Sequence, residues 1–167
     1  MKNEFVILVD ENDKKMGISE KMVTHRKGLL HRAFSIIIYN DQKKLLLQRR
    51  ALSKYHSGGL WSNACCGHPR PGEYIMDAAR RRLVEEMGFE CELEEKFTIH
   101  YYANLENEMV ENEIDHVLVG YKNDNRLIIN KDEISEWRWS SLDEIANDIN
   151  KNPKAYTTWF IKIIDHL

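Results

Sequence analysis

The chain has 167 residues, about the length that one hydrophobic core serves, so we expect a single domain over residues 1–167. At this length, 43% hydrophobic residues suffice for a core without disulfides. The net charge of −3 argues against a generic binder of nucleic acid or anionic membranes. No segment approaches the roughly 18 apolar residues of a membrane span.

The cysteines and the first residues bear on the location of the protein. Cys65, Cys66 and Cys91 are an odd number of cysteines, which suits a reducing compartment better than a disulfide framework. The first residues lack the long apolar stretch of a signal peptide. We therefore expect a cytoplasmic protein.

The first part of the chain predicts strands and one long loop. Residues 5–9 are a short apolar run that leads into a polar turn at 10–17. Residues 33–39 and 45–47, rich in β-branched and apolar side chains and separated by a polar turn, predict a hairpin. Residues 53–72 contain four glycines and two prolines, so they predict a long loop. Loops of this length in compact domains are often functional.

The second part predicts helices between strands. Residues 75–87 carry apolar side chains at helical spacing and end at Gly88, which predicts a helix. Residues 97–102, 114–121 and 137–139 predict strands. Ser141 and Glu144 form a capping box that opens a helix to about residue 149, and Pro153 begins another through residue 164. This order predicts an α/β or α+β domain with a mixed central sheet flanked by helices.

A loop and the helix after it carry a motif with chemical meaning. Residues 67–89 resemble the Nudix box, a loop-helix-loop, at Gly67, Glu73, Arg81, Leu83, Glu85, Glu86 and Gly88. Acidic side chains around the last helical turns can hold Mg²⁺, which offsets the charge of a diphosphate. In the alternative interpretation, Glu85 and Glu86 form a solvated face and Arg82 pairs with Glu86.

The motif departs from its usual form at one position. Glutamate usually stands where this chain has Arg82. Nudix hydrolases cluster glutamates to bind several metal ions and activate water, and a cation weakens such a cluster. The sequence therefore disfavours hydrolysis.

Further segments resemble one Nudix subfamily, the type I isopentenyl-diphosphate isomerases. They are residues 31–35, 49–54, 62–69 and 110–113, in the order and at nearly the spacing of that family. The resemblance covers about residues 5–159 and implies a Nudix-like sandwich. It also implies an enzyme that interconverts isopentenyl and dimethylallyl diphosphate through a tertiary carbocation, by protonation at one carbon and deprotonation at another.

The resemblance implies two metal sites. One consists of His25, His31, His68, Glu111 and Glu113, and three neutral imidazoles with two carboxylates suit one Mn²⁺, Zn²⁺ or Mg²⁺. The other is Mg²⁺ at Glu86, shared with the diphosphate of the substrate. Two residues apart on an extended chain, Glu111 and Glu113 point to one side, whereas His25 and His31 need a loop or turn to meet. Outside the motif, and given no role, are His56, His100, Asp115, His116 and His166.

The resemblance also implies the residues that act on the substrate. Aligned on Gly67 and His68, Cys66 rather than Cys65 matches the catalytic cysteine of the family. Cys66 and Glu113 deliver and remove the proton on opposite faces, and the sequence leaves open which of them is the acid. Tyr101 and Trp159 line the pocket of the cation. The diphosphate is bound by Lys21, Arg50, Lys54 and Arg82.

Two other hypotheses stay open. A Nudix hydrolase of a nucleoside or other diphosphate would keep its activity without Cys66 and would release phosphate products. A metal-binding module would hold Zn²⁺ through Cys65, Cys66 and His68, although structural zinc usually takes cysteine pairs with spacers. The expected partner is a small alkenyl diphosphate, with no nucleic acid, no membrane and no protein partner indicated by the sequence.

Overall fold

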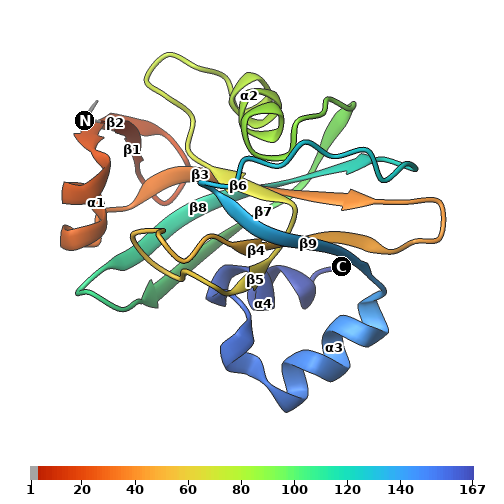
Figure 1. Cartoon of the computed structure of the whole chain (residues 1–167). Coiled ribbons are helices and arrows are strands. Elements are labelled where there is room, and N and C mark those ends of the chain that lie inside the picture. Colours follow the sequence, from red (N-terminus) through yellow and green to blue (C-terminus); the bar gives the residue numbers. More distant parts are fainter. Residues whose placement is uncertain (1–3) are drawn as a thin grey trace.

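The structure is a computed structural model that describes residues 4–167 (Figure 1). Its strands are β1 (Phe5–Val9), β2 (Lys15–Glu20), β3 (His31–Tyr39), β4 (Leu45–Arg50), β5 (Trp61–Ser62), β6 (Cys65–Gly67), β7 (Leu93–Asn104), β8 (Val110–Tyr121) and β9 (Ile134–Ser140). Its helices are α1 (Lys21–Lys27), α2 (Ile75–Met87), α3 (Leu142–Lys151) and α4 (Thr158–Ile164), with a 3-10 turn, η1 (Pro153–Ala155), before α4.

Strand β3 lies at the centre of a mixed sheet. Along one edge it pairs in parallel with β8, and this register sets His31 opposite Glu113. Its other edge is shared by β1, β6 and β4 in turn, and there Ser35 lies opposite Cys66. Because opposite residues on paired strands point to the same face, the sheet itself brings these side chains together.

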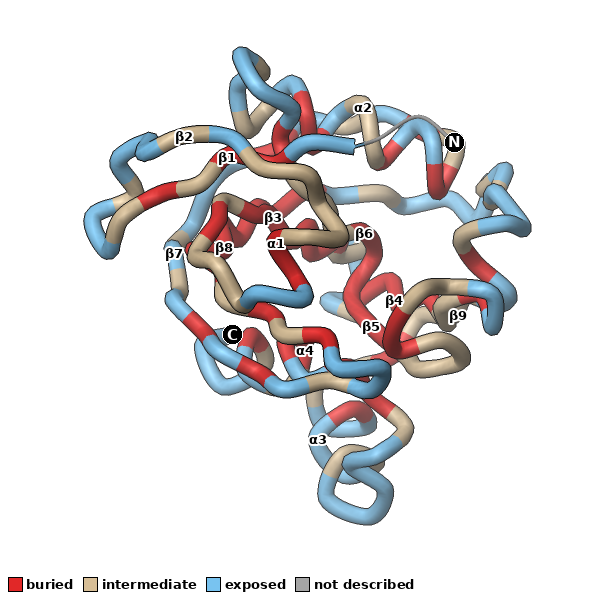
Figure 2. Tube along the Cα trace, turned by 90° about the vertical axis from the view of Figure 1, so that its left-hand side faces the viewer, coloured by how far each residue is buried: buried red, intermediate tan, exposed pale blue. Residues whose placement is uncertain are grey.

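The alternation of β3 divides the core between two faces of the sheet. Ile36 and Ile38 pack with Leu83 of α2 on one face, whereas Ile37 packs with Phe160 of α4 on the other. In Figure 1, α2 lies above the sheet and α3 and α4 lie below it. Figure 2 shows the buried segments gathered at the centre, around β3, β6 and β8. The predicted class, a mixed sheet flanked by helices, is confirmed.

Several predicted elements are confirmed. Helix α2 spans the predicted residues 75–87. Helix α3 begins with the predicted capping box, in which Ser141 accepts from the Glu144 backbone and Glu144 accepts from the Ser141 backbone. Strands β7 and β8 are longer than predicted, because each continues where it pairs with the other, from Leu93 opposite Gly120 to Asn104 opposite Val110.

Other predictions were wrong in part. The predicted turn at 10–17 contains the beginning of β2, and α1 was not predicted. The predicted loop at 53–72 contains β5 and β6. The hairpin of β3 and β4 pairs only at Tyr39 and Leu45, after which β4 pairs with β5 and β9.

The predicted last helix is interrupted. Tyr156 is extended and bridges to Trp61, and the Thr157 backbone N–H donates to the Trp61 carbonyl at 2.9 Å. Pairing with a strand distant in sequence therefore ends η1 before α4 begins.

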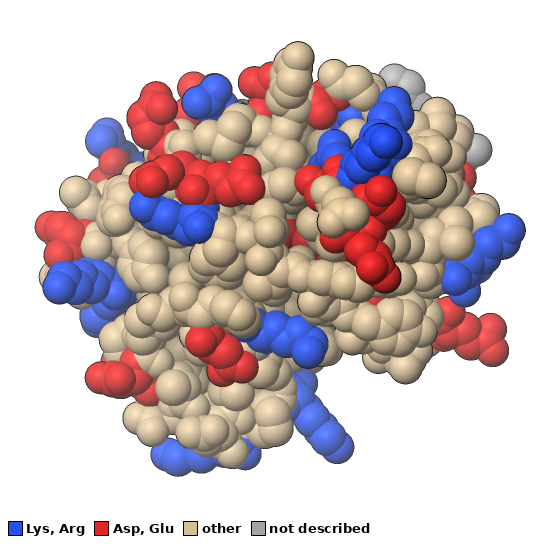
Figure 3. Space-filling view, turned by 180° about the vertical axis from the view of Figure 1, so that it is seen from behind, with Lys and Arg blue, Asp and Glu red and all other residues tan. Residues whose placement is uncertain are grey.

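The surface and the helices agree with the expectations from composition. On the face seen in Figure 3, acidic and basic side chains lie interspersed. Within residues 4–167, no helix is both long and apolar enough to cross a bilayer.

Candidate active site

A cavity of about 750 Å³ lies at the end of the sheet where β3 and β4 diverge. Most of the predicted site residues line it: Lys21, Arg50, Lys54, Cys66, His68, Arg82, Glu86, Tyr101, Glu111, Glu113 and Trp159. The other two, His25 and His31, are fully buried and contact the ring of His68, with centroids 5.5 and 4.9 Å away. Residues from six different elements therefore meet in one place.

The predicted meeting of His25 and His31 depends on the turn after α1. Gly28 ends α1 with φ of 62°, a left-handed conformation that glycine adopts without strain. The chain then enters β3 at His31, and the two imidazole centroids lie 4.9 Å apart. The expectation that a turn is needed is therefore confirmed.

Hydrogen bonds from the backbone orient both imidazoles. Nδ1 of His25 donates to the carbonyl of Lys21 at 2.8 Å, and Nδ1 of His31 donates to the carbonyl of Leu29 at 2.8 Å. Each ring therefore presents the lone pair of Nε2 to the site. This is the arrangement in which histidine binds metals, with the other nitrogen held by a carbonyl.

The Nε2 atoms converge with a carboxylate. His31 Nε2 lies 3.2 Å from His68 Nε2, and Glu113 Oε1 lies 3.2 Å from the first and 3.0 Å from the second. His25 Nε2 is buried and has no hydrogen-bond partner among residues 4–167. Lone pairs that face one another and an orphaned buried nitrogen both call for a cation, so these residues fit a divalent metal.

The charges of the group agree with this fit. Burial lowers the pKa of His68 to about 3, so its imidazole is neutral at pH 7. Burial by itself raises the pKa of Glu113, but hydrogen bonds from His31 and His68 outweigh it and hold the pKa well below its usual range. Neutral imidazoles and an ionised carboxylate are the protonation states that bind metal.

Glu111 and an unpredicted histidine form a second part of the same cluster. Nε2 of His56 lies 3.2 Å from Oε1 of Glu111, and the hydroxyl of Tyr101 donates to the other carboxylate oxygen. Burial and the charge of Glu113 raise the pKa of Glu111. The sequence analysis gave His56 no role. Its place in the long loop at 53–72 was the one signal that pointed toward it.

The metal-binding groups do not support a zinc module. Within the described part of the chain, the groups that can hold a metal are His25, His31, His68 and Glu113, and His25, His56 and Glu111. Neither group contains Cys65 or Cys66, so the hypothesis of a cysteine zinc site is wrong.

The Cys66 thiol lies in a polar niche of the cavity. Trp159 Nε1 donates to Sγ at 3.1 Å, and Sγ lies 3.2 Å from Oδ1 of Asn63 and 3.6 Å from Oγ of Ser35. Burial raises the pKa of Cys66 to about 12, so the thiol keeps its proton at neutral pH.

A buried carboxyl group stands behind this niche. Ser35 Oγ donates to Asp115 Oδ2 at 2.7 Å, and burial raises the pKa of Asp115 well above its usual range. The sequence analysis gave Asp115 no role and did not mention Ser35 as a site residue. The register of β3 with β6 and β8 brings them to Cys66, and no local pattern indicates it.

The cations at the mouth of the cavity are paired with carboxylates. Lys21 Nζ lies 2.7 Å from Glu4, and Lys54 Nζ lies 2.6 Å from Glu133. Arg50 has a different partner, because its guanidinium lies 5.2 Å from the centroid of the Trp159 ring. Glu133, which was not predicted, also lies 3.5 Å from Arg82.

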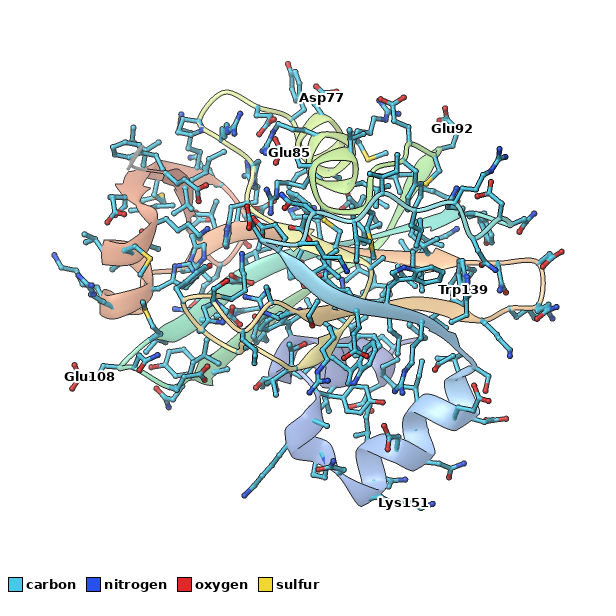
Figure 4. The ribbon with its side chains drawn as sticks, viewed as in Figure 1. Asp77, Glu85, Glu92, Glu108, Trp139 and Lys151 are labelled. Atoms are coloured by element: carbon cyan, nitrogen blue, oxygen red, sulfur yellow. The ribbon has the colours of Figure 1, made fainter. Side chains whose placement is uncertain are left out.

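The Nudix helix holds both predicted interpretations in part. Arg82 pairs with Glu86, as the alternative predicted, and also with Glu85 at 2.6 Å (Figure 4). Glu86 is buried and accepts from Gln48 Nε2 at 2.9 Å, so it is not part of a solvated face. Gly67 is close-packed, because a Cβ there would lie 2.9 Å from the ring of Phe34.

Comparisons with known proteins agree with this site. A family model described as NUDIX domain matches residues 29–160. The chain is 52% identical to isopentenyl-diphosphate Delta-isomerase 1 of Aromatoleum aromaticum, over 97% of this chain and 91% of that one. It is 49% identical to isopentenyl-diphosphate Delta-isomerase of Burkholderia multivorans, over 97% and 92%.

Solved structures show the same fold at low sequence identity. A Deinococcus radiodurans protein superposes with a TM-score of 0.81 at 18% identity, covering 98% of each chain. A MutT protein of Methanosarcina mazei superposes with a TM-score of 0.68 at 19% identity, over 82% of this chain and 91% of that one. With the NUDIX match and relatives near 50% identity over almost its whole length, the chain belongs to the isopentenyl-diphosphate Delta-isomerase family of NUDIX-domain proteins.

Proposed function

We propose that the protein interconverts isopentenyl diphosphate and dimethylallyl diphosphate, the activity for which its relatives are named. The observation that supports this most directly is the position of Cys66 and Glu113, which line the same cavity from β6 and β8. The reaction moves a double bond and needs one group to give a proton and another to take one.

The protonation states support the same pair. The thiol of Cys66 holds its proton at neutral pH, and the carboxylate of Glu113 holds none. In this state Cys66 can donate to the alkene and Glu113 can remove a proton from the neighbouring carbon. One turnover transfers one proton from the thiol to the carboxylate, and the reverse reaction starts from that exchanged state.

The reaction passes through a tertiary cation, because an alkene is a very weak base. Trp159 and Tyr101 line the cavity, and an aromatic face in a desolvated pocket stabilises a cation by up to ~2 kcal/mol. Both rings are buried, so water has little access to quench the cation there.

The metal ligands in this proposal are His25, His31, His68, Glu111 and Glu113 for one Mn²⁺, Zn²⁺ or Mg²⁺, with Glu86 for Mg²⁺ beside the diphosphate. A bound divalent ion supplies positive charge that keeps its carboxylate ligands ionised and offsets the charge of the diphosphate. Glu113 is in this way both ligand and proton acceptor.

The diphosphate is held by Lys21, Arg50, Lys54 and Arg82, all of which line the cavity. In the ligand-free protein, three of them are paired with Glu4, Glu133 and Glu86. The phosphate oxygens take the place of these carboxylates when the substrate binds. The partner is therefore a small alkenyl diphosphate, and we place the protein in the cytoplasm.

The test follows both products and isotope. The protein is incubated with isopentenyl diphosphate and divalent metal in heavy water, and NMR should detect dimethylallyl diphosphate that carries deuterium. Cys66→Ala should lower the rate by at least about 10³-fold with the fold retained, because it removes the proton donor. Cys91→Ala, outside the cavity, is the matched control and should keep the rate. Release of phosphate, or full activity of Cys66→Ala, would contradict the proposal.

A further inference from the structure

His56 is a buried imidazole that the proposed reaction does not use. It lies between β4 and β5 and is only 3% exposed, although most of its loop lies near the surface. Its ring stacks on His25 with centroids 5.9 Å apart and meets Trp159 edge-on at 5.8 Å. His56 therefore packs between the metal cluster and the aromatic wall of the cavity.

The donor atom of His56 is spaced like those of the proposed ligands. Neighbouring donors on a six-coordinate ion with bonds of about 2.1 Å lie about 3.0 Å apart. His31 Nε2 lies 3.2 Å from His68 Nε2, and His68 Nε2 lies 3.0 Å from Glu113 Oε1. His56 Nε2 lies 3.2 Å from Oε1 of Glu111, which is the same relation.

The two metal-binding groups also share a member. His25 belongs both to the group with His31, His68 and Glu113 and to the group with His56 and Glu111. Within each group the donor atoms lie within 4.8 Å of one another. Since Nδ1 of His25 is bonded to the Lys21 carbonyl, only its Nε2 can bind a metal, and both groups must serve one ion.

The loop is built to hold the His56 ring in this orientation. Nδ1 of His56 lies 3.1 Å from Oγ of Ser57, and if it donates there, Nε2 is left with its lone pair. Ser57 has φ of 53°, a conformation that residues other than glycine rarely adopt. Its backbone N–H donates to Glu106 of the loop between β7 and β8. Strained residues of this kind cluster at ligand clamps.

We propose that His56 binds the metal through Nε2, as a sixth side chain beside His25, His31, His68, Glu111 and Glu113. The inference rests on the proposed metal centre. Four imidazoles and two carboxylates then fill an octahedral shell, which suits Mn²⁺ better than Zn²⁺, whose protein sites are mostly four-coordinate. A shell filled by side chains leaves no open position, so the substrate does not bind this ion directly.

Metal affinity tests the proposal without measuring catalysis. Metal-free wild type and His56→Gln are titrated with Mn²⁺, and free Mn²⁺ is measured by electron paramagnetic resonance. We expect the affinity to fall at least about tenfold in His56→Gln. His166→Gln, an exposed histidine, is the matched control and should bind as the wild type does. Circular dichroism of the metal-free proteins checks the fold.

A double-mutant cycle separates a ligand from a residue that only orients Glu111. If His56 is a ligand, His56→Gln lowers the affinity in the Glu111→Gln background as well. If it acts only through Glu111, the second substitution has no further effect and the proposal is wrong. Should His56→Gln fail to fold, Ser57→Ala, which removes the partner of Nδ1, should also weaken binding.

The outcomes also separate this inference from the proposed function. Wild type that binds Mn²⁺ and isomerises its substrate, with an unchanged affinity in His56→Gln, overturns the role of His56 alone. Wild type that neither binds a divalent ion nor isomerises overturns both.

Discussion

The hydrogen bonds around Cys66 limit where its proton can point. Because the Trp159 N–H donates to the sulfur, the S–H group is directed toward Asn63 Oδ1 or Ser35 Oγ. Asn63 is itself fixed, since its amide N–H groups donate to the carbonyls of Ile36 and Cys65. The thiol is therefore held by groups that cannot easily turn away, as a proton donor at a reacting carbon requires.

The raised pKa of Cys66 has a measurable consequence at the residue scale. A thiol with pKa of about 12 is almost fully protonated at pH 7, and its thiolate fraction increases about tenfold per pH unit up to that pKa. In a Cys91→Ala background, alkylation of Cys66 by iodoacetamide should therefore be slow at pH 7 and still rising at pH 10. Mass spectrometry of the modified peptide measures the rate. A plateau below pH 9 would show an ordinary thiol.

Ser35 is predicted to matter for stability as well as position. Its hydroxyl is the hydrogen-bond donor to Asp115 Oδ2, and Asp115 Oδ1 has no partner among the described residues. Ser35→Ala leaves the buried carboxyl without a donor, so the free energy of unfolding should fall by about 1–3 kcal/mol. Urea unfolding measures the change, with the exposed Ser135→Ala as control. An equal loss in both variants would contradict this role.

At the scale of elements, α2 supplies both packing and charge. Leu83 and Met87 pack into the core, while Arg82 and Glu86 lie at the cavity one helical turn apart. The ion pairs of Arg82 with Glu85, Glu86 and Glu133 keep its guanidinium at the mouth of the cavity. In this helix a cation takes the position that a glutamate has in the usual motif, and it is suited to bind phosphate rather than metal.

The role of Arg82 is open to a direct measurement. Arg82→Ala should lower kcat/KM for isopentenyl diphosphate about 10- to 100-fold, because a charged hydrogen bond to phosphate contributes about 1.5–3 kcal/mol. Arg80→Ala, on the same helix but outside the cavity, should leave kcat/KM within about twofold. Steady-state kinetics distinguish the two variants. Equal losses would mean that the helix, and not the guanidinium, is disturbed.

At the scale of the whole molecule, one sheet carries the site between two cores. The parallel pairing of β3 with β8 places His31 beside Glu113, and β6 inserts Cys66 beside Ser35. β4 diverges from β3 toward the end that bears Arg50, and the cavity lies there. Helices α2 and α4 close the two faces, so α2 contributes Arg82 and α4 contributes Trp159.

Removal of the metal should weaken the whole fold. Glu111 and Glu113 are both buried, and without a cation their charges repel each other in a medium of low dielectric. Chelation should lower the midpoint of thermal unfolding, and Mn²⁺ at about 100 times its dissociation constant should restore about 2.7 kcal/mol. Calorimetry measures both. Glu113→Gln should respond little to either treatment, and an identical response would place the ion elsewhere.

The sequence by itself determined whatever depends on neighbours along the chain. The helix at 75–87, the capping box at Ser141 and the shared side of Glu111 and Glu113 follow from periodicities of 3.6 and 2 residues. The motifs along the chain indicated the family and most of the residues that line the cavity.

The tertiary structure alone decided what depends on register between distant strands. It interrupted the last helix at Tyr156, because that residue pairs with Trp61. It brought His56 to Glu111 and Ser35 to Asp115, at separations of 55 and 80 residues. Such contacts leave no local periodicity, since each is set by the pairing of whole strands and the packing of loops against them.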